Sequence, residues 1–405
     1  MTYTTDILII GAGIIGLTLA YTLKQKQPDV RIIILEKESD VAKHGSGRNS
    51  GVIHAGFYYT PDSLKAKLTA EGNRLMKAFC RKHDIPMREC GKVVIAQNEA
   101  EQAGIHELHR RGNANQVTTQ IIDEQQLAEI EPNAKTSGIA LFSPDTASVN
   151  PVAVSQMLKK ILSEQGVHFL FAEAYRKRGS KNSIITSKNN RIQAKKIVNS
   201  GGLYADKIAQ DFGFSQHYTI LPFKGIYLKY AFDDHPLRTH VYPVPNLNNP
   251  FLGVHFTLTV EGHLKIGPTA IPAFWRENYH QMQGFDLKEC ASILALEARL
   301  FCNNAFHFRA LAREEMRKYN KNYLTSEALK MVKTMKAAGF QNWSTPGIRA
   351  QLLDKRDFKL VQDFVVEGDE ESVHILNAVS PAFTGSFAFA MWCVEHHFNL
   401  DTLAQ

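Results

Sequence analysis

Three glycines and one acid near the start of the sequence have the spacing of a phosphate- and ribose-binding turn. Gly11, Gly13 and Gly16 follow a short apolar run, and Glu36 follows a second apolar run roughly 20 residues later. Gly11 permits the tight turn, Gly13 lets a pyrophosphate approach the backbone, and Gly16 lets a helix pack against a strand. Glu36 can accept hydrogen bonds from a ribose hydroxyl pair. The pattern predicts a dinucleotide site, and its alternative is a glycine-rich turn without a ligand.

Regular elements must flank these residues for the site to form. The apolar runs 6–10 and 32–35 predict buried parallel strands, and residues 17–24 predict the helix between them. The N-terminus of that helix would present unpaired N–H groups and the positive end of its dipole to the phosphates.

A second loop of small residues follows directly. His44 to Gly56 contains four further glycines interleaved with Ser, Arg, Asn and His. A nicotinamide enzyme has little use for such a loop beside the ribose acid, whereas a flavin enzyme must also hold a ribityl chain and a ring system. The loop therefore favours FAD over NAD, and the alternative is a polar surface loop.

The run Gly47-Arg-Asn-Ser-Gly-Val-Ile-His-Ala-Gly-Phe-Tyr-Tyr-Thr-Pro61 resembles the L-2-hydroxyglutarate dehydrogenase/oxidase family. That family belongs to the FAD-dependent oxidoreductases related to D-amino-acid oxidase, and the similarity continues in order along nearly the whole chain. The resemblance implies a tightly held noncovalent FAD, although His44 in the loop leaves covalent attachment open. The sequence departs from the family pattern at Asn150, Thr269, Phe383 and Gly385, which bears on substrate identity more than on flavin chemistry.

We expect an α/β fold in which a Rossmann-like FAD-binding domain, of the glutathione-reductase-like D-amino-acid oxidase type, is interleaved with an antiparallel-sheet substrate domain. A chain of 405 residues exceeds what one hydrophobic core usually supports. The second strand–glycine–helix unit, around residues 196–208, returns the chain to the cofactor domain. The expected segments are 1–85, 145–220 and 340–405 for the FAD domain, and 86–144 and 221–339 for the substrate domain.

The residues that we expect to bind the cofactor come from four loops, two of them identified through the family resemblance. They are Gly11, Gly13, Ile14, Ile15, Gly16, Glu36, Lys37, Gly47, Arg48, Asn49, Ser50, Gly51, Val52, Ser200, Gly201, Gly202, Pro381, Thr384, Gly385 and Ser386.

The substrate side needs a base and a cation. His54 is the first candidate for the base because imidazole titrates near working pH and its loop runs beside the flavin. His255, in a motif that the resemblance places inside the substrate domain, is the second, and a structural role remains open for each histidine. Arg349 resembles the arginine of the wider group's Gly-x-Arg motif and can bind a carboxylate bidentately. Lys224 and Tyr242 could reach a distal carboxylate.

Together these residues and the resemblance predict FAD-dependent oxidation of an L-2-hydroxy acid, in particular L-2-hydroxyglutarate to 2-oxoglutarate. Electrons would pass to a quinone or another acceptor, with oxygen as a slow one. One alternative is an amine or amino-acid oxidase of the same fold. The other is a non-catalytic flavin-containing protein associated with a membrane.

Composition sets the remaining bounds. With 44% hydrophobic and 21% charged residues, the chain has the make-up of an ordinary globular protein. Its five cysteines are odd in number and lack C-x-x-C spacing, which indicates reduced thiols. We expect no metal site, no nucleic-acid partner, no secretory signal and no membrane span, hence a cytoplasmic protein.

A basic run in the second half of the chain leaves peripheral contact with the membrane open. Its simplest interpretation is a solvated face, and it consists of Arg309, Arg313, Arg317, Lys318 and Lys321.

Overall fold

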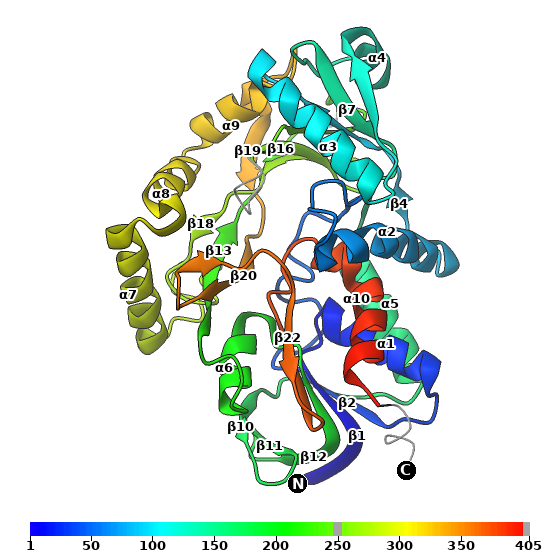
Figure 1. Ribbon diagram of the computed structural model, residues 1–405, viewed down its shortest axis with the longest axis vertical. Coiled ribbons are helices and arrows are strands. Elements are labelled where there is room, and N and C mark those ends of the chain that lie inside the picture. The colour runs from blue at the N-terminus through cyan, green and yellow to red at the C-terminus, as the bar shows by residue number, and fades with distance from the viewer. Residues whose placement is uncertain (233, 246–252, 400–405) are drawn as a thin grey trace. The chain divides into compact units, whose positions relative to one another are not determined.

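The computed structural model describes residues 1–232, 234–245 and 253–399, and the chain divides into two compact units (Figure 1). Unit 1 comprises Met1–Asn49, Pro151–Pro222 and Arg349–Gln405, and unit 2 comprises Ser50–Asn150 and Phe223–Ile348. Both units are discontinuous. Residues 50–85, 145–150 and 340–348 belong to unit 2 and residues 221–222 to unit 1, so the observed boundaries differ from the expected segments at these places. Strand β3 (Val52–Ile53) pairs with β8 (Ala147–Val149) within unit 2.

The sheet of unit 1 is built around strand β1, Thr2–Ile10, which pairs in parallel with β2, Ile32–Leu35, on one side and β12, Arg191–Asn199, on the other. The strand order is β10-β11-β12-β1-β2-β9, and β23 also pairs with β12. Residues 5–10 of β1 are all buried, as expected for a parallel strand covered on both faces. The other strands are β9 (His168–Leu170), β10 (Tyr175–Arg178), β11 (Ser183–Thr186), β22 (Val365–Gly368) and β23 (Ser372–Leu376).

Three helices of unit 1 pack together. Helix α1 (Ile14–Lys26) contacts both α5 (Pro151–Glu164) and α10 (Ala382–His397), as Figure 1 shows. Helices α1 and α10 are buried on nearly all sides, which explains why neither has a polar stripe. A short helix, α6 (Ala205–Asp211), follows the 3₁₀ turn Gly202–Tyr204.

The main sheet of unit 2 has the strand order β19-β14-β17-β16-β15-β5-β7-β6. Its neighbours are antiparallel except β5 (Lys92–Ile95) and β15 (His240–Pro243), which run parallel, so the expected antiparallel sheet contains one parallel pair. The other strands are β6 (Gln120–Asp123), β7 (Ile139–Ser143), β14 (Leu228–Tyr230), β16 (His255–Leu258), β17 (Leu264–Gly267) and β19 (Phe340–Trp343). A smaller sheet joins β3, β8 and β4 (Met87–Arg88).

The two faces of this main sheet differ in chemistry because side chains alternate along each strand. One face carries the apolar core, with Val93, Val241, Phe256 and Ile266. The neighbouring residues in the same strands therefore point to the opposite face, and they include Lys92, Tyr242, His255 and Lys265.

Six helices of unit 2 lie within the described residues. Helix α4 begins with a capping box in which Asp123 and Gln126 bond reciprocally to each other's backbone. The helices are α2 (Leu64–Lys82), α3 (Gln102–Ala114), α4 (Glu124–Ile130), α7 (Leu287–Asn303), α8 (Phe308–Arg317) and α9 (Lys321–Leu329). The 3₁₀ turns are Glu99–Glu101, Ala305–His307 and Ala337–Gly339.

The chain passes between the units within β13 (Tyr218–Gly225) and again within β20 (Gly347–Asp354). In unit 2, β13 pairs with β18 (Ile271–Pro272), and in unit 1, β20 pairs with β21 (Lys359–Leu360). All five cysteines lie in the described part of the chain and are free thiols. Among the described residues, none of the helices combines the length and the apolar composition needed to cross a bilayer.

A buried carboxylate ties the segment after α4 to the start of β15. Glu131 is fully buried, and its Oε2 accepts hydrogen bonds from the backbone N–H groups of Arg238 at 2.6 Å and Thr239 at 2.7 Å. Its Oε1 accepts a longer one from the N–H of Asn133 at 3.4 Å. These bonds fix the segment that leads into β15.

We expect Glu131→Ala to lower the free energy of unfolding by about 2–3 kcal/mol, because buried N–H groups would lose their acceptor. Glu131→Gln keeps the size and one acceptor oxygen, so it should cost about half as much. Urea denaturation followed by circular dichroism measures both. Equal stability of wild type and Glu131→Ala would contradict this role.

Candidate active site

The glycine turn of unit 1 has no space for side chains. Gly11 has φ +106°, and a Cβ there would lie 2.6 Å from the carbonyl oxygen of Ser200. A Cβ on Gly16 would collide with the carbonyl oxygen of Gly11. These contacts bring β1, α1 and β12 together at the carboxyl end of β1, where a parallel sheet places its ligands.

The N-terminus of α1 has glycine at its N-cap position. Gly13 has no side chain that could accept from the first N–H groups of the helix. The N–H of Ile14 donates to Ser46 Oγ at 2.8 Å, which anchors the following loop to the helix. Ile15 lies in the same first turn. Such an N-terminus attracts anions, phosphate above all.

Glu36 stands at the end of β2, half-buried. Its Oε2 accepts from the N–H of Ala12 at 2.8 Å, and its Oε1 accepts from the N–H of Glu38 at 2.9 Å. A carboxylate has about four lone-pair sites, so these two bonds orient it and still leave acceptor capacity for ribose hydroxyls.

Lys37 and His44 both pair with Glu38, at 2.5 Å and 2.8 Å from its Oε1. Burial of Glu38 opposes ionisation, but the hydrogen bonds from Lys37 and His44 lower the pKa of Glu38 to about 2. Through Glu38, the side chains of Lys37 and His44 therefore connect the segment after β2 to the second glycine loop.

The second glycine loop is held by its own side chains. Arg48 Nε donates to the carbonyl of Lys43 at 2.6 Å, and Asn49 Nδ2 donates to that of Ser46 at 2.8 Å. A Cβ on Gly47 would collide with the carbonyl oxygen of Ala42. In this arrangement Arg48 and Asn49 shape the loop. The loop continues into unit 2 with Ser50, Gly51 and Val52, the last paired with Ser148.

The third glycine loop packs beside the first, as its resemblance to a downstream family motif implied. Ser200 Oγ donates to the carbonyls of Ile10 at 2.9 Å and Gly11 at 3.1 Å. Gly201 donates its N–H to Asn199 Oδ1 at 3.1 Å, and Gly202 begins the 3₁₀ turn.

The fourth loop forms the start of α10. Pro381 is its N-cap residue, and its side chain offers no acceptor to the first N–H groups of the helix. Thr384, Gly385 and Ser386 are buried in its first turns. Within the described residues, Ser386 Oγ has no hydrogen-bond partner although it is fully buried. Phe383, the bulky residue of this loop, is half-buried.

Two predicted substrate residues of unit 2 are in direct contact. The rings of Tyr242 and His255 stack with centroids 3.7 Å apart and planes inclined by 16°. His255 Nδ1 lies 2.7 Å from the carbonyl oxygen of Gly253, which can only accept, so Nδ1 carries the proton and donates it. In the neutral ring, Nε2 is then the atom that can take up a proton.

The other predicted residues have contacts of their own. His54 is buried in the loop after β3, where Asn73 Nδ2 donates to the carbonyls of His54 at 3.1 Å and Asp145 at 3.0 Å. Lys224, in β13, donates to Asn278 Oδ1 at 3.0 Å, and burial lowers its pKa. Arg349 is half-buried in β20 and belongs to unit 1.

Two lysines that the sequence reasoning passed over share the sheet face with Tyr242 and His255. Burial lowers the pKa of Lys92 to about 7 and that of Lys265 to about 8. Lys265 Nζ donates to the carbonyl of Ser50 at 3.1 Å and lies 4.6 Å from the ring centroid of Tyr227. The sequence does contain a sign of these two residues. Each lysine interrupts an otherwise apolar strand.

Comparison with known proteins agrees with this picture. The family model described as FAD dependent oxidoreductase matches residues 6–396. The chain is 35% identical over 386 residues to an L-2-hydroxyglutarate dehydrogenase of Escherichia coli, covering 94% of this chain and 90% of that protein. It is 34% identical over 428 residues to a mitochondrial L-2-hydroxyglutarate dehydrogenase of Nematostella vectensis, covering 98% and 91%.

Among solved structures, the L-alpha-glycerophosphate oxidase of Mycoplasma pneumoniae with FAD bound is similar in fold. Its TM-score is 0.75 at 21% identity, covering 97% of this chain and 94% of that one. The residues of unit 1 fit the cofactor. The N-termini of α1 and α10, a half-buried acid after β2 and a Ser386 hydroxyl without a partner among the described residues occur together in it. The chain belongs to the FAD-dependent oxidoreductases, in the L-2-hydroxyglutarate dehydrogenase family.

Proposed function

We propose that this chain oxidises L-2-hydroxyglutarate to 2-oxoglutarate with FAD as its cofactor. The observation that carries the proposal is sequence identity of about a third, spread over nearly the entire chain, with relatives named L-2-hydroxyglutarate dehydrogenase. Identity of this extent includes both units, so it covers substrate-side residues as well as the glycine turns.

The four loops of unit 1 are the residues that would hold FAD. The N-terminus of α1 would receive the pyrophosphate, and Glu36 the ribose hydroxyls. The N-terminus of α10 would stabilise negative charge. When bound, FAD accepts the electron pair of the substrate C2–H bond.

The oxidation also releases the proton of the substrate hydroxyl, and a base must take it. His255 suits this role because its Nδ1–H is committed to the carbonyl of Gly253, which leaves Nε2 as the basic atom. His54 is the other candidate, held by the bonds of Asn73 to its loop.

A dicarboxylate substrate needs cationic or donor groups at both ends. Arg349 would clamp the carboxylate beside C2 through a bidentate pair. Lys224 and Tyr242 are the candidates for the distal carboxylate. Binding at two ends fixes the C2–H bond in one orientation, which is the basis of selectivity for one enantiomer.

The surface of unit 2 has an apolar stripe on helix α7 that bears on the electron acceptor. Helix α7 buries Glu289, Ile293 and Leu300 but exposes Leu287, Leu294 and Phe301, seven residues apart. One apolar side of the helix packs against the protein. The other apolar side is exposed, and an apolar surface outside this unit would stabilise it.

Exposed arginines follow on α8, namely Arg309, Arg313 and Arg317. Lys318, which was expected on a solvated face, is instead buried and paired with Glu315 at 2.5 Å. We propose that the α7 stripe touches a membrane surface, where the arginines meet acidic head groups and a quinone is within reach.

Anaerobic titration of the purified protein with L-2-hydroxyglutarate tests the activity. We expect the flavin absorbance to bleach with the L enantiomer and to stay unchanged with the D enantiomer. A flavin that bleaches with amines or amino acids only would establish the amine-oxidase alternative. A flavin that no small acid or amine reduces would establish a non-catalytic flavoprotein.

Glu36→Ala should weaken FAD binding by roughly 10- to 100-fold, because the variant loses hydrogen bonds to a charged group. Titration of the apoprotein, followed by quenching of flavin fluorescence, gives the dissociation constant. Glu164→Ala removes an exposed acid of the same unit and is the control. Unchanged FAD affinity in Glu36→Ala would remove Glu36 from the site.

Leu294→Glu/Phe301→Glu should abolish flotation with anionic vesicles and slow reduction of a vesicle-bound quinone at least tenfold, because two charges would enter the apolar stripe. Reduction of a water-soluble dye should be retained. Val152→Glu, at an exposed apolar residue of α5, is the matched control. Equal vesicle binding by wild type and the double variant would rule out this surface.

A further inference from the structure

Lys92 is the most unusual buried group in unit 2. Its side chain is fully buried, and within the described residues Nζ has no hydrogen-bond partner. A buried ammonium without a hydrogen-bond partner is costly, since the hydrogen bonds that it makes to water are lost on burial. A group retained under such conditions is a candidate for a functional role.

Aromatic rings surround this amine. Nζ lies 4.1 Å from the ring centroid of Tyr242, 5.1 Å from that of Tyr58 and 5.6 Å from that of Phe57. Ring faces carry negative charge density, so they attract the ammonium form. The cage is thus able to hold a charged Lys92 without a carboxylate.

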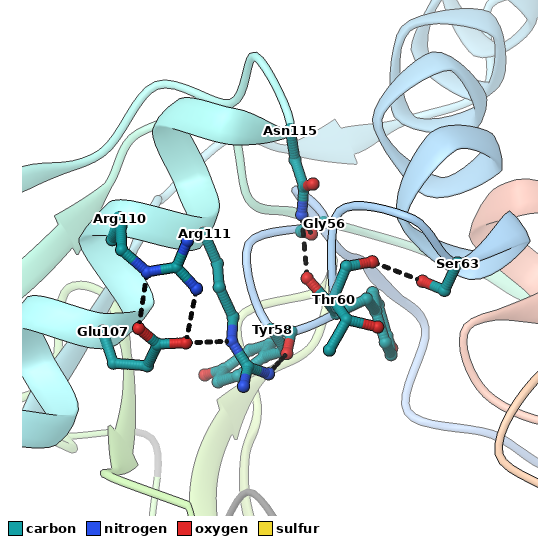
Figure 2. Close-up of polar contacts among 9 residues, drawn as sticks. Gly56, Tyr58, Thr60, Ser63, Glu107, Arg110, Arg111 and Asn115 are labelled. Atoms are coloured by element: carbon teal, nitrogen blue, oxygen red, sulfur yellow. Dashed lines mark hydrogen bonds and ion pairs between the residues drawn. The ribbon is translucent and has the colours of Figure 1, made fainter.

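The loop that supplies two of these rings is held in place by α3, as Figure 2 shows. Arg111 Nη1 donates to the carbonyl of Tyr58 at 2.9 Å, and Asn115 Nδ2 donates to that of Gly56 at 3.1 Å. Glu107 binds Arg111 Nε at 2.7 Å and fixes the guanidinium. The position of the cage therefore does not depend on Lys92 itself.

Tyr242 separates Lys92 from His255. Strand β15 lies between β5 and β16, so Lys92 and His255 reach the ring of Tyr242 from opposite sides. Both lie close to it, with Nζ 4.1 Å and the imidazole centroid 3.7 Å from its centroid. The ring of Tyr242 is therefore in contact with both the amine and the imidazole.

We propose that Lys92 is a positioning residue of the oxidation site, which through Tyr242 holds the ring of His255 in place and keeps it in the neutral, proton-accepting form. A positive charge behind Tyr242 disfavours a second positive charge on the imidazole. The role rests on the proposed function, in which His255 is a candidate for the base.

Several other titratable groups lie near Lys92. His240, beside Lys92 on β15, has its pKa lowered to about 3 by burial, so it stays neutral. Burial raises the pKa values of Tyr58 and Tyr242 well above their usual range. Burial likewise raises the pKa of Cys90 to about 11. Lys265 on β17 and Arg88 on β4 are the other cations near this face.

The direction of the effect follows from the sign of the charge. Burial lowers the pKa of Lys92 to about 7, so below this pH the amine is charged. Its charge then lowers the pH at which His255 takes up a proton. Lys92→Met removes the charge and keeps the apolar stem, so the pKa of His255 should rise by about one unit.

NMR of protein labelled with ¹³C-histidine measures this pKa directly, without substrate. The His255 signal is identified by its loss in His255→Gln. We expect the His255 titration to move upward in Lys92→Met and in Lys92→Gln. Lys229→Met, at an exposed lysine of β14 in the same sheet, is the matched control and should leave it in place. An unchanged His255 titration in both Lys92 variants would overturn the proposal.

The unfolding temperature shows that the variant folds. Because the pKa of Lys92 is lower in the folded protein than in the unfolded chain, the unfolded chain binds more protons between about pH 7 and the usual lysine range. The resulting destabilisation is complete below pH 7, so Lys92→Met should melt at a higher temperature than wild type at pH 6.

Steady-state kinetics with L-2-hydroxyglutarate then separates this inference from the proposed function. If His255 is the base, the acid limb of kcat/KM moves upward together with its NMR titration. An acid limb that stays in place while the NMR titration moves would retain the coupling of Lys92 to His255. It would assign the base to another residue, with His54 as the alternative.

Discussion

The close approach of three backbone segments at the carboxyl end of β1 is the constraint on which unit 1 depends. Gly11 must accept φ +106° and lie against the Ser200 carbonyl, and Gly16 must lie against the Gly11 carbonyl. Neither contact tolerates a Cβ atom. The parallel pairing of β1 with β2 and β12 then brings Glu36 and Ser200 to the same edge, although 164 residues separate Glu36 from Ser200 in the sequence. The pairing of the strands thereby places residues that are far apart in the sequence at the same edge of the sheet.

In unit 2, the alternation of side chains along the strands of the main sheet brings the candidate substrate residues together. Its main sheet has one face committed to the apolar core, and alternation sends every second side chain to the other face. That face collects Lys92, Tyr242, His255 and Lys265 from four strands. Packing and hydrogen bonds hold the side chains of this face: Tyr242 packs in a cluster with Phe57 and Tyr58. His255 donates to the carbonyl of Gly253, and Lys265 donates to that of Ser50. A rigid sheet is well suited to hold groups for proton transfer, since small displacements weaken such chemistry.

The glycine turn of unit 1 is easier to predict from the sequence than the surroundings of His255 and Lys92, for a physical reason. Gly11, Gly13 and Gly16 are constrained by local backbone geometry, which a short motif records completely. The tautomer of His255 depends on the carbonyl of Gly253 two residues away, and its stacking depends on Tyr242 from a neighbouring strand. The single parallel pair, β5 with β15, is equally non-local. Lys92 was passed over because nothing near it in the sequence indicates that Phe57, Tyr58 and Tyr242 enclose it.

Lys92 is a buried amine that destabilises the folded protein, and the aromatic rings around it indicate why a lysine is present there. Methionine or leucine in the same cage would avoid the desolvation of an amine and would pack against the same rings. Stability alone therefore does not explain a lysine at this position. A carboxylate partner would lower the cost of burial, yet it would also cancel the field that the amine exerts on His255. An aromatic cage stabilises the cation without neutralising it. Tyr242 thus faces a cation on one side and an imidazole on the other, and only the arrangement without a counter-ion transmits the charge of Lys92 to the histidine.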